Sequence, residues 1–188
     1  QKLQQQLKLN TDLAKAAQIF HEAEGILAEE RLKGIEVVAK QEISLREAEE
    51  HINKQADKML REGLESLSQA EVGSALQVFF NLETLEHAVH EIMKKQTTRL
   101  SQVAASSVDM ATIASSGSGG RRDASAARWK ETFWAGLEKA MEQFKEPLIV
   151  IWHLQRVLAK KRDPISHICF LDVLVKPGYV FDILSICS

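Results

Sequence analysis

The sequence predicts an all-α protein in which long amphipathic helices pack antiparallel as an elongated bundle or coiled coil. Hydrophobic residues make up 45% of the 188 residues, but aromatic residues only 6%, and there are three prolines. In four long segments the apolar residues recur mostly three, four or seven positions apart, as one face of a helix requires. Each segment is well beyond the usual helix length of about 11–12 residues.

The first two helices are expected over residues 3–27 and about 35–67, with a break at Gly34. The apolar face of the first holds Leu3, Leu7, Leu13, Ala17, Phe20 and Leu27. The face of the second holds Ile35, Val38, Leu45, Ala48, Ile52, Met59 and Leu67. Both stripes are wide enough for antiparallel packing against a neighbouring helix.

A capping box at residues 68–71 predicts the start of the third helix near Gln69. The Ser68 hydroxyl can accept from the Glu71 amide while the Glu71 carboxylate reaches back to the Ser68 amide. From there one continuous helix is expected to fade near Ile113. Its apolar face holds Val72, Leu76, Phe79, Leu82, Leu85, Val89, Ile92 and Leu100.

A Ser/Gly-rich segment, residues 114–124, is expected to be a flexible linker, because it offers little apolar surface to offset the entropy of ordering. A fourth helix follows, capped by Asp123 or Ser125, and Pro147 should kink it. Three cations and then Asp163-Pro164 mark its end. Its apolar face holds Phe133, Leu137, Met141, Phe144, Leu148, Ile151, Leu154 and Leu158.

These elements divide the chain into a coiled-coil region (1–113), the linker (114–124), an amphipathic helical region (125–175) and an atypical tail (176–188). The tail opens with a Lys-Pro-Gly turn and has no helical period. We interpret it as a foreign or truncated end, and the first residue, Gln1, suggests a fragment.

The charge balance of 24 basic and 26 acidic residues indicates neither nucleic acid as a partner nor an acidic tail. Cys169 and Cys187 have no pattern typical of a zinc site or a disulfide framework, so the reducing cytosol is the expected compartment. No apolar run reaches the ~18 residues that a membrane span needs. Membrane association is therefore expected only through partners or a surface.

Candidate chemical sites are outweighed by simpler interpretations. His87 and His90 lie on one helix face, but the Glu-x-x-His pattern of di-iron bundles is missing, so a solvated face is favoured. The glycine-rich stretch at 117–122 lacks the Lys and the preceding strand of a phosphate-binding loop. His167 and Cys169 lack a marked base or oxyanion hole, which favours a buried Cys beside a helix end. No catalytic residue, cofactor, metal or small-molecule substrate is predicted.

Two surface features remain open. Lys160, Lys161 and Arg162 could contact phosphate, but cations at a helix C-terminus are the favoured interpretation. Phe79 and Phe80 point about 100° apart on a helix, and the aromatic residues Trp129, Phe133, Trp134 and Trp152 likewise spread around the fourth helix. Aromatic residues on several faces fit either a partner surface or burial inside one bundle.

Two strings carry a family resemblance. LQRVLAKKRDPISHICF (154–170) and EVGSALQVFFNLETL (71–85) are similar to strings of subunit five of the conserved oligomeric Golgi complex, a vesicle-tethering assembly. The resemblance runs from about Thr11 and ends near Leu171. It implies a fold of stacked helical bundles, and it identifies the chain as a truncated N-terminal portion of the subunit that assembles with sister subunits.

On this resemblance, the chain is expected to be a non-enzymatic, peripheral protein at the cytosolic face of the Golgi membrane, acting in retrograde intra-Golgi transport. Its partners would be the other subunits of the complex, with indirect membrane association. The alternative is a self-associating coiled-coil scaffold unrelated to Golgi traffic. The residues expected at a partner interface are Leu76, Phe79, Phe80, Leu82, Trp134 and Trp152.

Overall fold

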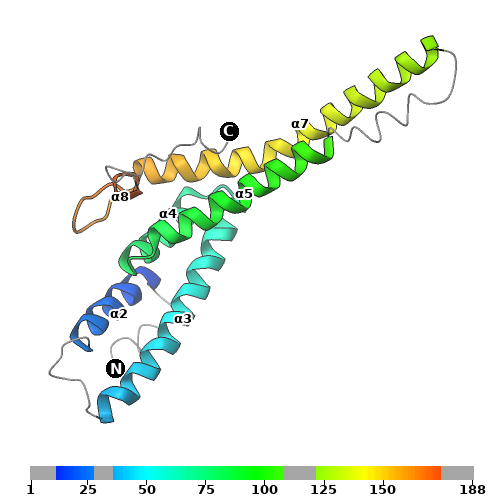
Figure 1. Ribbon diagram of the computed structural model, residues 1–188. Helices are drawn as coiled ribbons and strands as arrows, with labels where there is room; N and C mark the ends of the chain where they lie inside the picture. Colours follow the sequence, from blue (N-terminus) through cyan, green and yellow to red (C-terminus); the bar gives the residue numbers. More distant parts are fainter. Residues whose placement is uncertain (1–11, 28–35, 108–121, 175–188) are drawn as a thin grey trace. The chain divides into compact units, whose positions relative to one another are not determined.

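The computed structural model describes residues 12–27, 36–107 and 122–174, and all structural statements below concern these residues. They form α2 (Leu13–Leu27), α3 (Glu36–Glu65), α4 (Gln69–Asn81), α5 (Leu85–Ser107), α7 (Arg122–Lys160) and α8 (Phe170–Leu174) (Figure 1). The extended pairing found among them is one isolated antiparallel bridge between Arg162 and Cys169. The predicted all-α fold class is therefore confirmed.

The first two predicted helices correspond to α2 and α3. Asp12 caps α2, because its Oδ1 accepts a hydrogen bond of 3.1 Å from the amide of Lys15. Residues 1–11 and the expected break at Gly34 lie outside the described residues. The end of α3 at Glu65 agrees with the predicted end within two residues.

The continuous third helix was a wrong prediction. Helix α4 ends at Asn81, and α5 begins at Leu85. Between them Glu83 has a positive φ of 58°, and the amides of Glu83 and Thr84 donate to the carbonyls of Phe80 and Phe79 at 3.1 and 2.9 Å. This is the Schellman arrangement that ends many helices, here with a glutamate at the left-handed position that glycine usually occupies.

The turn between α3 and α4 has a similar geometry and confirms half of the predicted capping box. Leu67 takes a φ of 55°, and the Ser68 amide donates to Gly63 O at 2.9 Å. The Ser68 hydroxyl accepts from the Glu71 amide at 3.4 Å, as predicted. The reciprocal bond was predicted wrongly: the Ser68 amide is already used, and the Glu71 carboxylate accepts from the Ser66 hydroxyl at 3.3 Å.

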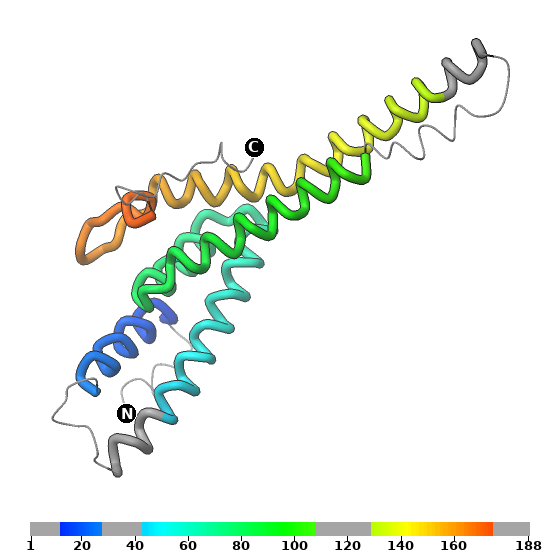
Figure 2. Tube along the Cα trace, in the orientation of Figure 1, coloured from blue at the N-terminus to red at the C-terminus, as the bar shows by residue number. Residues whose placement is uncertain are grey.

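The described residues divide into two compact units, of which the first holds residues up to His90 and from His153 onward. In this unit α2, α3 and α4 pack against one another (Figure 2). Gly63 allows α3 and α4 to approach closely, because a Cβ there would lie 2.9 Å from the amide nitrogen of Val72. The core side chains include Ala17, Phe20, Ile52, Ala56, Leu60, Val72, Leu76, Phe79, Leu154 and Phe170.

The second unit, Glu91–Trp152, pairs segments of α5 and α7 in antiparallel order. Arg99 meets Glu146, whereas Ser107, later on α5, approaches Gly136, which is earlier on α7. Helix α7 remains one helix through Pro147, which is fully buried. The predicted linker is wrong at residues 122–124, which already belong to α7; the rest of it lies outside the described residues.

Candidate partner interface

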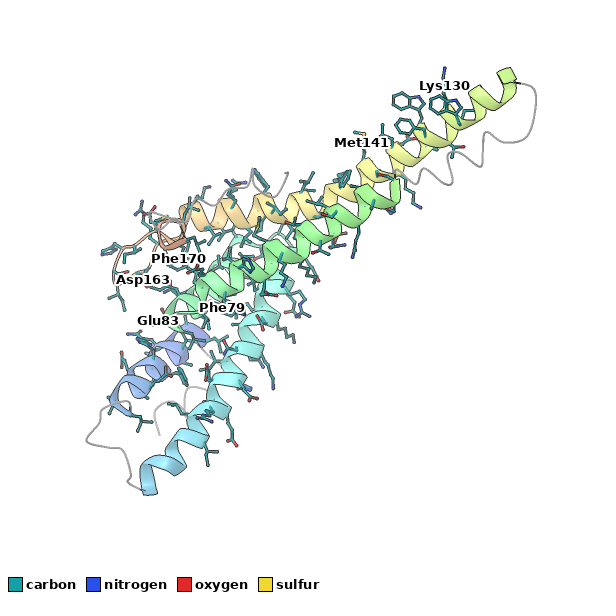
Figure 3. All side chains as sticks on the ribbon, viewed as in Figure 1. Phe79, Glu83, Lys130, Met141, Asp163 and Phe170 are labelled. Carbon is teal, nitrogen blue, oxygen red and sulfur yellow. The ribbon has the colours of Figure 1, made fainter. Side chains whose placement is uncertain are left out.

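The strongest sequence signature folds into a short loop between α7 and α8. Helix α7 ends at Lys160, close to the predicted stop before Asp163-Pro164. Asp163 Oδ2 accepts hydrogen bonds from the amides of Ile165 (3.1 Å) and Ser166 (2.6 Å), and the Asp163 amide donates to Ile168 O at 3.0 Å. One buried carboxylate thus closes the turn that follows the proline (Figure 3).

The same carboxylate ends a hydrogen-bond relay that joins three parts of the first unit. Gln77 Nε2 donates to Asp163 Oδ1 at 2.8 Å and to Asn81 Oδ1 at 3.0 Å. Asn81 Nδ2 in turn donates to the carbonyl of Ala14 at 2.7 Å. The relay therefore connects α2, α4 and the loop after α7.

The direction of the relay is fixed by its ends. The Ala14 carbonyl can only accept, so Asn81 must present nitrogen to it and oxygen to Gln77. Gln77 must then direct its NH₂ group at Asp163, which serves as acceptor. Burial alone would raise the pKa of the Asp163 carboxyl, but hydrogen bonds from Ser166, Gln77 and Ile165 together lower it below its ordinary value.

Four of the six expected interface residues lie in the first unit, and two of these are core residues. Leu76 and Phe79 are buried within the chain. Phe80 is half-buried and stacks on Phe170, with ring centroids 4.9 Å apart and an angle of 17° between the rings. Leu82 is half-buried at the end of α4. For Phe80 the structure thus supports burial inside one chain, one of the two interpretations left open by the sequence.

The other two expected residues, Trp134 and Trp152, are exposed on α7 in the second unit. Trp134, Met141 and Leu148 follow one another at spacings of seven residues and are 63%, 67% and 52% exposed. This spacing places them in one stripe along the helix. Figure 3 labels Met141 on α7. Ala140 and Pro147, on another side of α7, are buried. We call Trp134, Met141 and Leu148 the α7 stripe.

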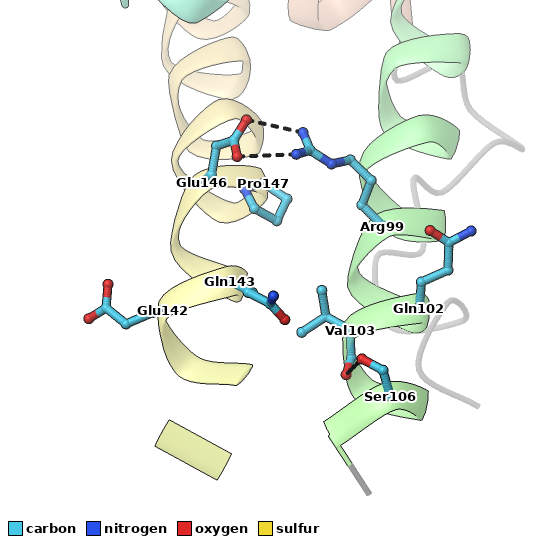
Figure 4. Close-up of a pocket in the computed structure, with 8 residues that line it drawn as sticks. All are labelled: Arg99, Gln102, Val103, Ser106, Glu142, Gln143, Glu146 and Pro147. Atoms are coloured by element: carbon cyan, nitrogen blue, oxygen red, sulfur yellow. Dashed lines mark hydrogen bonds and ion pairs between the residues drawn. The ribbon is translucent and has the colours of Figure 1, made fainter. Parts of the chain in front are cut away.

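An open groove of about 650 Å³ lies between α5 and α7 in the second unit (Figure 4). Arg99 and Glu146 form a two-pronged ion pair across it, with N–O distances of 3.2 and 3.1 Å. Both side chains are exposed, so the pair sets the register of the two helices more than it stabilises them. The groove is lined by Arg99, Gln102, Val103, Ser106, Glu142, Gln143, Glu146 and Pro147.

The candidate chemical sites occupy plain structural positions. His87 and His90 are exposed on α5, as expected for a solvated face. Cys169 is buried beside the end of α7, with its Sγ 3.5 Å from Leu158 O, which confirms that interpretation; Cys187 lies outside the described residues. Within the described ranges, no group of three or more His, Cys, Asp or Glu could hold a metal ion. No helix there is long and apolar enough to cross a membrane.

Sequence reasoning missed the relay. Gln77 is one of only two buried glutamine or asparagine residues in the described part of the chain, and Asn81 follows it at the i, i+4 spacing of one helix face. A polar pair within an otherwise apolar stretch was the available signal. Its partner Asp163, however, lies 86 positions away in the sequence.

Comparison with known proteins gives a consistent family match. Residues 32–188 match the family model described as "Conserved oligomeric Golgi complex subunit 5, C-terminal". The chain is 36% identical over 178 residues to subunit 5 of this complex from Arabidopsis thaliana and 32% identical over 177 residues to that of Mus musculus. Each alignment covers 89% of this chain and 21% of the relative. No solved structure matches the chain.

The match corrects two details of the resemblance. The family model describes a C-terminal part of the subunit, whereas the resemblance had implied an N-terminal portion. The matched range also continues to residue 188, beyond the expected end near Leu171. The chain spans about a fifth of the length of these curated relatives.

Proposed function

This chain belongs to the family of subunit 5 of the conserved oligomeric Golgi complex, and on that premise we propose that it serves vesicle tethering as a non-enzymatic assembly element. It would bind sister subunits through helix–helix contacts and so act in retrograde intra-Golgi transport. Its place would be the cytosolic face of the Golgi membrane, as a peripheral protein. The family match does not favour the alternative of an unrelated, self-associating scaffold.

The α7 stripe is the observation that carries the proposal. Large apolar side chains that are more than half exposed leave apolar surface in water, which a partner would bury. Their spacing of seven residues fits the seam between two packed helices. Charged side chains, Glu138 and Lys145, lie between the stripe residues and are also exposed, as at the edge of a helix–helix interface.

The α7 stripe also suggests which of the expected residues contact a partner. Trp134 belongs to it, and Trp152 is exposed further along α7. Leu76 and Phe79 would act indirectly, since their side chains hold the first unit together. Phe80 and Leu82 remain secondary candidates because each is only half-buried.

Affinity capture of the other subunits by the tagged chain tests the proposal. Trp134→Ala combined with Met141→Ala should lower the affinity for the other subunits by at least about tenfold. Truncating an aromatic side chain that becomes buried in the interface typically costs ~2 kcal/mol or more of binding free energy. Ile43→Ala is the matched control, since Ile43 is as exposed as Trp134 but lies on α3.

The variants should keep the wild-type thermal unfolding midpoint, because their side chains are exposed and make few internal contacts. If the double variant captures the sister subunits as well as the wild type does, the α7 stripe is not part of the interface. Equal losses in the stripe and control variants would show that capture depends on surface hydrophobicity in general. Absence of sister subunits from the wild-type capture would contradict the proposed assembly itself.

A further inference from the structure

Loop 161–169, between α7 and α8, holds two isoleucines at the protein surface. Ile165 is 69% exposed and Ile168 is 45% exposed. Figure 2 shows the loop as an orange hairpin at the end of α7. Large apolar side chains in water carry a free-energy cost that a neighbouring apolar phase would remove.

Hydrogen bonds at the base of the loop keep these side chains in place. Phe170 N donates to Lys161 O at 3.1 Å, and Asp163 N donates to Ile168 O at 3.0 Å. The Asp163 carboxylate additionally holds the amides of Ile165 and Ser166. The backbone of the turn is thus tied at several points, and it presents the isoleucines on a pre-formed tip.

Cations lie beside the isoleucines. Lys160 and Arg162 are exposed, and Arg162 Nη1 lies 3.4 Å from the carbonyl of His167, next to Ile168 in the chain. In the described part of the structure neither cation forms an ion pair. Residues 156–172 contain four basic and two acidic side chains, a local net charge of +2 in a chain of net charge −2. One of the two acids, Asp163, is buried and satisfied by hydrogen bonds.

We propose that loop 161–169 contacts an anionic membrane surface. Ile165 and Ile168 would enter the boundary between headgroups and acyl chains, and Lys160 and Arg162 would bind lipid phosphates. This direct lipid contact goes beyond helix–helix assembly with sister subunits, and it uses a different part of the chain from the α7 stripe.

The geometry favours a membrane over an acidic protein surface. A stable protein interface buries about 800 Å² on each partner, which requires a broad patch of side chains. The loop offers two apolar side chains on a single turn with cations beside them. An insertion tip with phosphate-binding flanks needs no more than that, because the bilayer supplies the apolar phase and the negative charge.

Vesicle flotation of the full chain, without other subunits, tests the proposal. The chain should bind vesicles of phosphatidylcholine with phosphatidylserine, bind vesicles of phosphatidylcholine alone much more weakly, and detach as salt is raised. Ile165→Asn with Ile168→Asn should weaken binding at least about tenfold, since two buried apolar side chains are lost. Lys160→Gln and Arg162→Gln should each weaken it roughly fivefold.

Ile26→Asn is the matched control. Ile26 is 60% exposed on α2, but its exposed neighbours include Glu22 and Glu24 instead of cations. This variant should bind anionic vesicles as the wild type does. All these side chains are exposed, so circular dichroism should show unchanged helix content.

Several results would overturn the proposal. The wild type could fail to bind either kind of vesicle, or it could bind neutral and anionic vesicles equally well. The double isoleucine variant could bind as strongly as the wild type, or Ile26→Asn could lose as much binding as the double isoleucine variant does. If the wild type ignores vesicles but the loop variants lose capture of an acidic protein, the loop is a protein-binding element instead. None of these outcomes affects subunit assembly, which is measured separately.

Discussion

Replacing Asp163 with asparagine should destabilise the first unit although the two side chains have nearly the same shape. The carboxylate accepts on both oxygens: Oδ1 from Gln77 Nε2 at 2.8 Å, and Oδ2 from the amides of Ser166 and Ile165 at 2.6 and 3.1 Å. An amide offers one oxygen and one NH₂ group, so in either orientation its NH₂ meets a donor.

The rest of the relay cannot absorb this conflict. Turning Gln77 would direct its oxygen at the Asn81 oxygen, and turning Asn81 as well would direct oxygen at the Ala14 carbonyl. One or two hydrogen bonds to a charged acceptor are therefore lost, each contributing about 1.5–3 kcal/mol. We expect Asp163→Asn to lower the free energy of unfolding by about 2–4 kcal/mol.

Urea unfolding followed by circular dichroism at neutral pH measures this change. Asp172→Asn, an exposed acid on α8, is the control and should stay within about 0.5 kcal/mol of the wild type. A change of the same small size for Asp163→Asn would refute the reasoning, because it would mean that the carboxylate's bonds are replaced at no cost.

The pH dependence of the same difference is a second test. The pKa of Asp163 in the folded chain lies below its ordinary value of 3.8, so its ionised form is favoured by folding. Ionised Asp163 therefore stabilises the folded chain fully above pH 3.8, and this stabilisation is lost as the pH falls through the pKa that Asp163 has in the folded chain. The difference in the free energy of unfolding between the wild type and Asp163→Asn should therefore become smaller as the pH falls below 3.8.

The remaining predictions concern packing, and urea unfolding measures them all. Phe79→Ala should cost about 3–5 kcal/mol because Phe79 is buried, whereas Phe80→Ala, which loses a half-buried ring stacked on Phe170, should cost roughly half as much; equal costs would contradict this difference. Gly63→Ala should cost about 1–3 kcal/mol, since its Cβ would lie 2.9 Å from Val72 N. A Cβ at Gly25 would meet nothing within 4 Å, so Gly25→Ala should raise the free energy of unfolding by about 0.5–1 kcal/mol. If both glycine variants changed the free energy of unfolding in the same direction, the close approach of α3 and α4 at Gly63 would be contradicted.

The sequence was sufficient where the controlling interaction is local. The Ser68 cap depends on a residue three positions away, and the end of α7 depends on the Asp163-Pro164 pair just beyond it. Core residues such as Phe79 follow from helical periodicity.

The sequence was insufficient where a break or a contact leaves no local signal. The apolar spacing continues from Phe79 through Leu82 to Leu85, so it gives no sign of the turn between them. The usual marker, glycine, is replaced by Glu83 with a φ of 58°. Phe170 and Phe80 stack across 90 positions, and periodicity states only that a face is apolar, not which distant ring covers it.

Subunit assembly is tested most directly by the mass of the complex that we propose the chain forms with the other subunits of the conserved oligomeric Golgi complex. The tagged chain would be co-expressed with them, purified, and measured by size-exclusion chromatography with light scattering. We predict a stoichiometric mixed complex that the Trp134→Ala, Met141→Ala double variant fails to form stably. A chain that elutes only as a monomer or as a homodimer, with the sister subunits in separate peaks, would contradict the account.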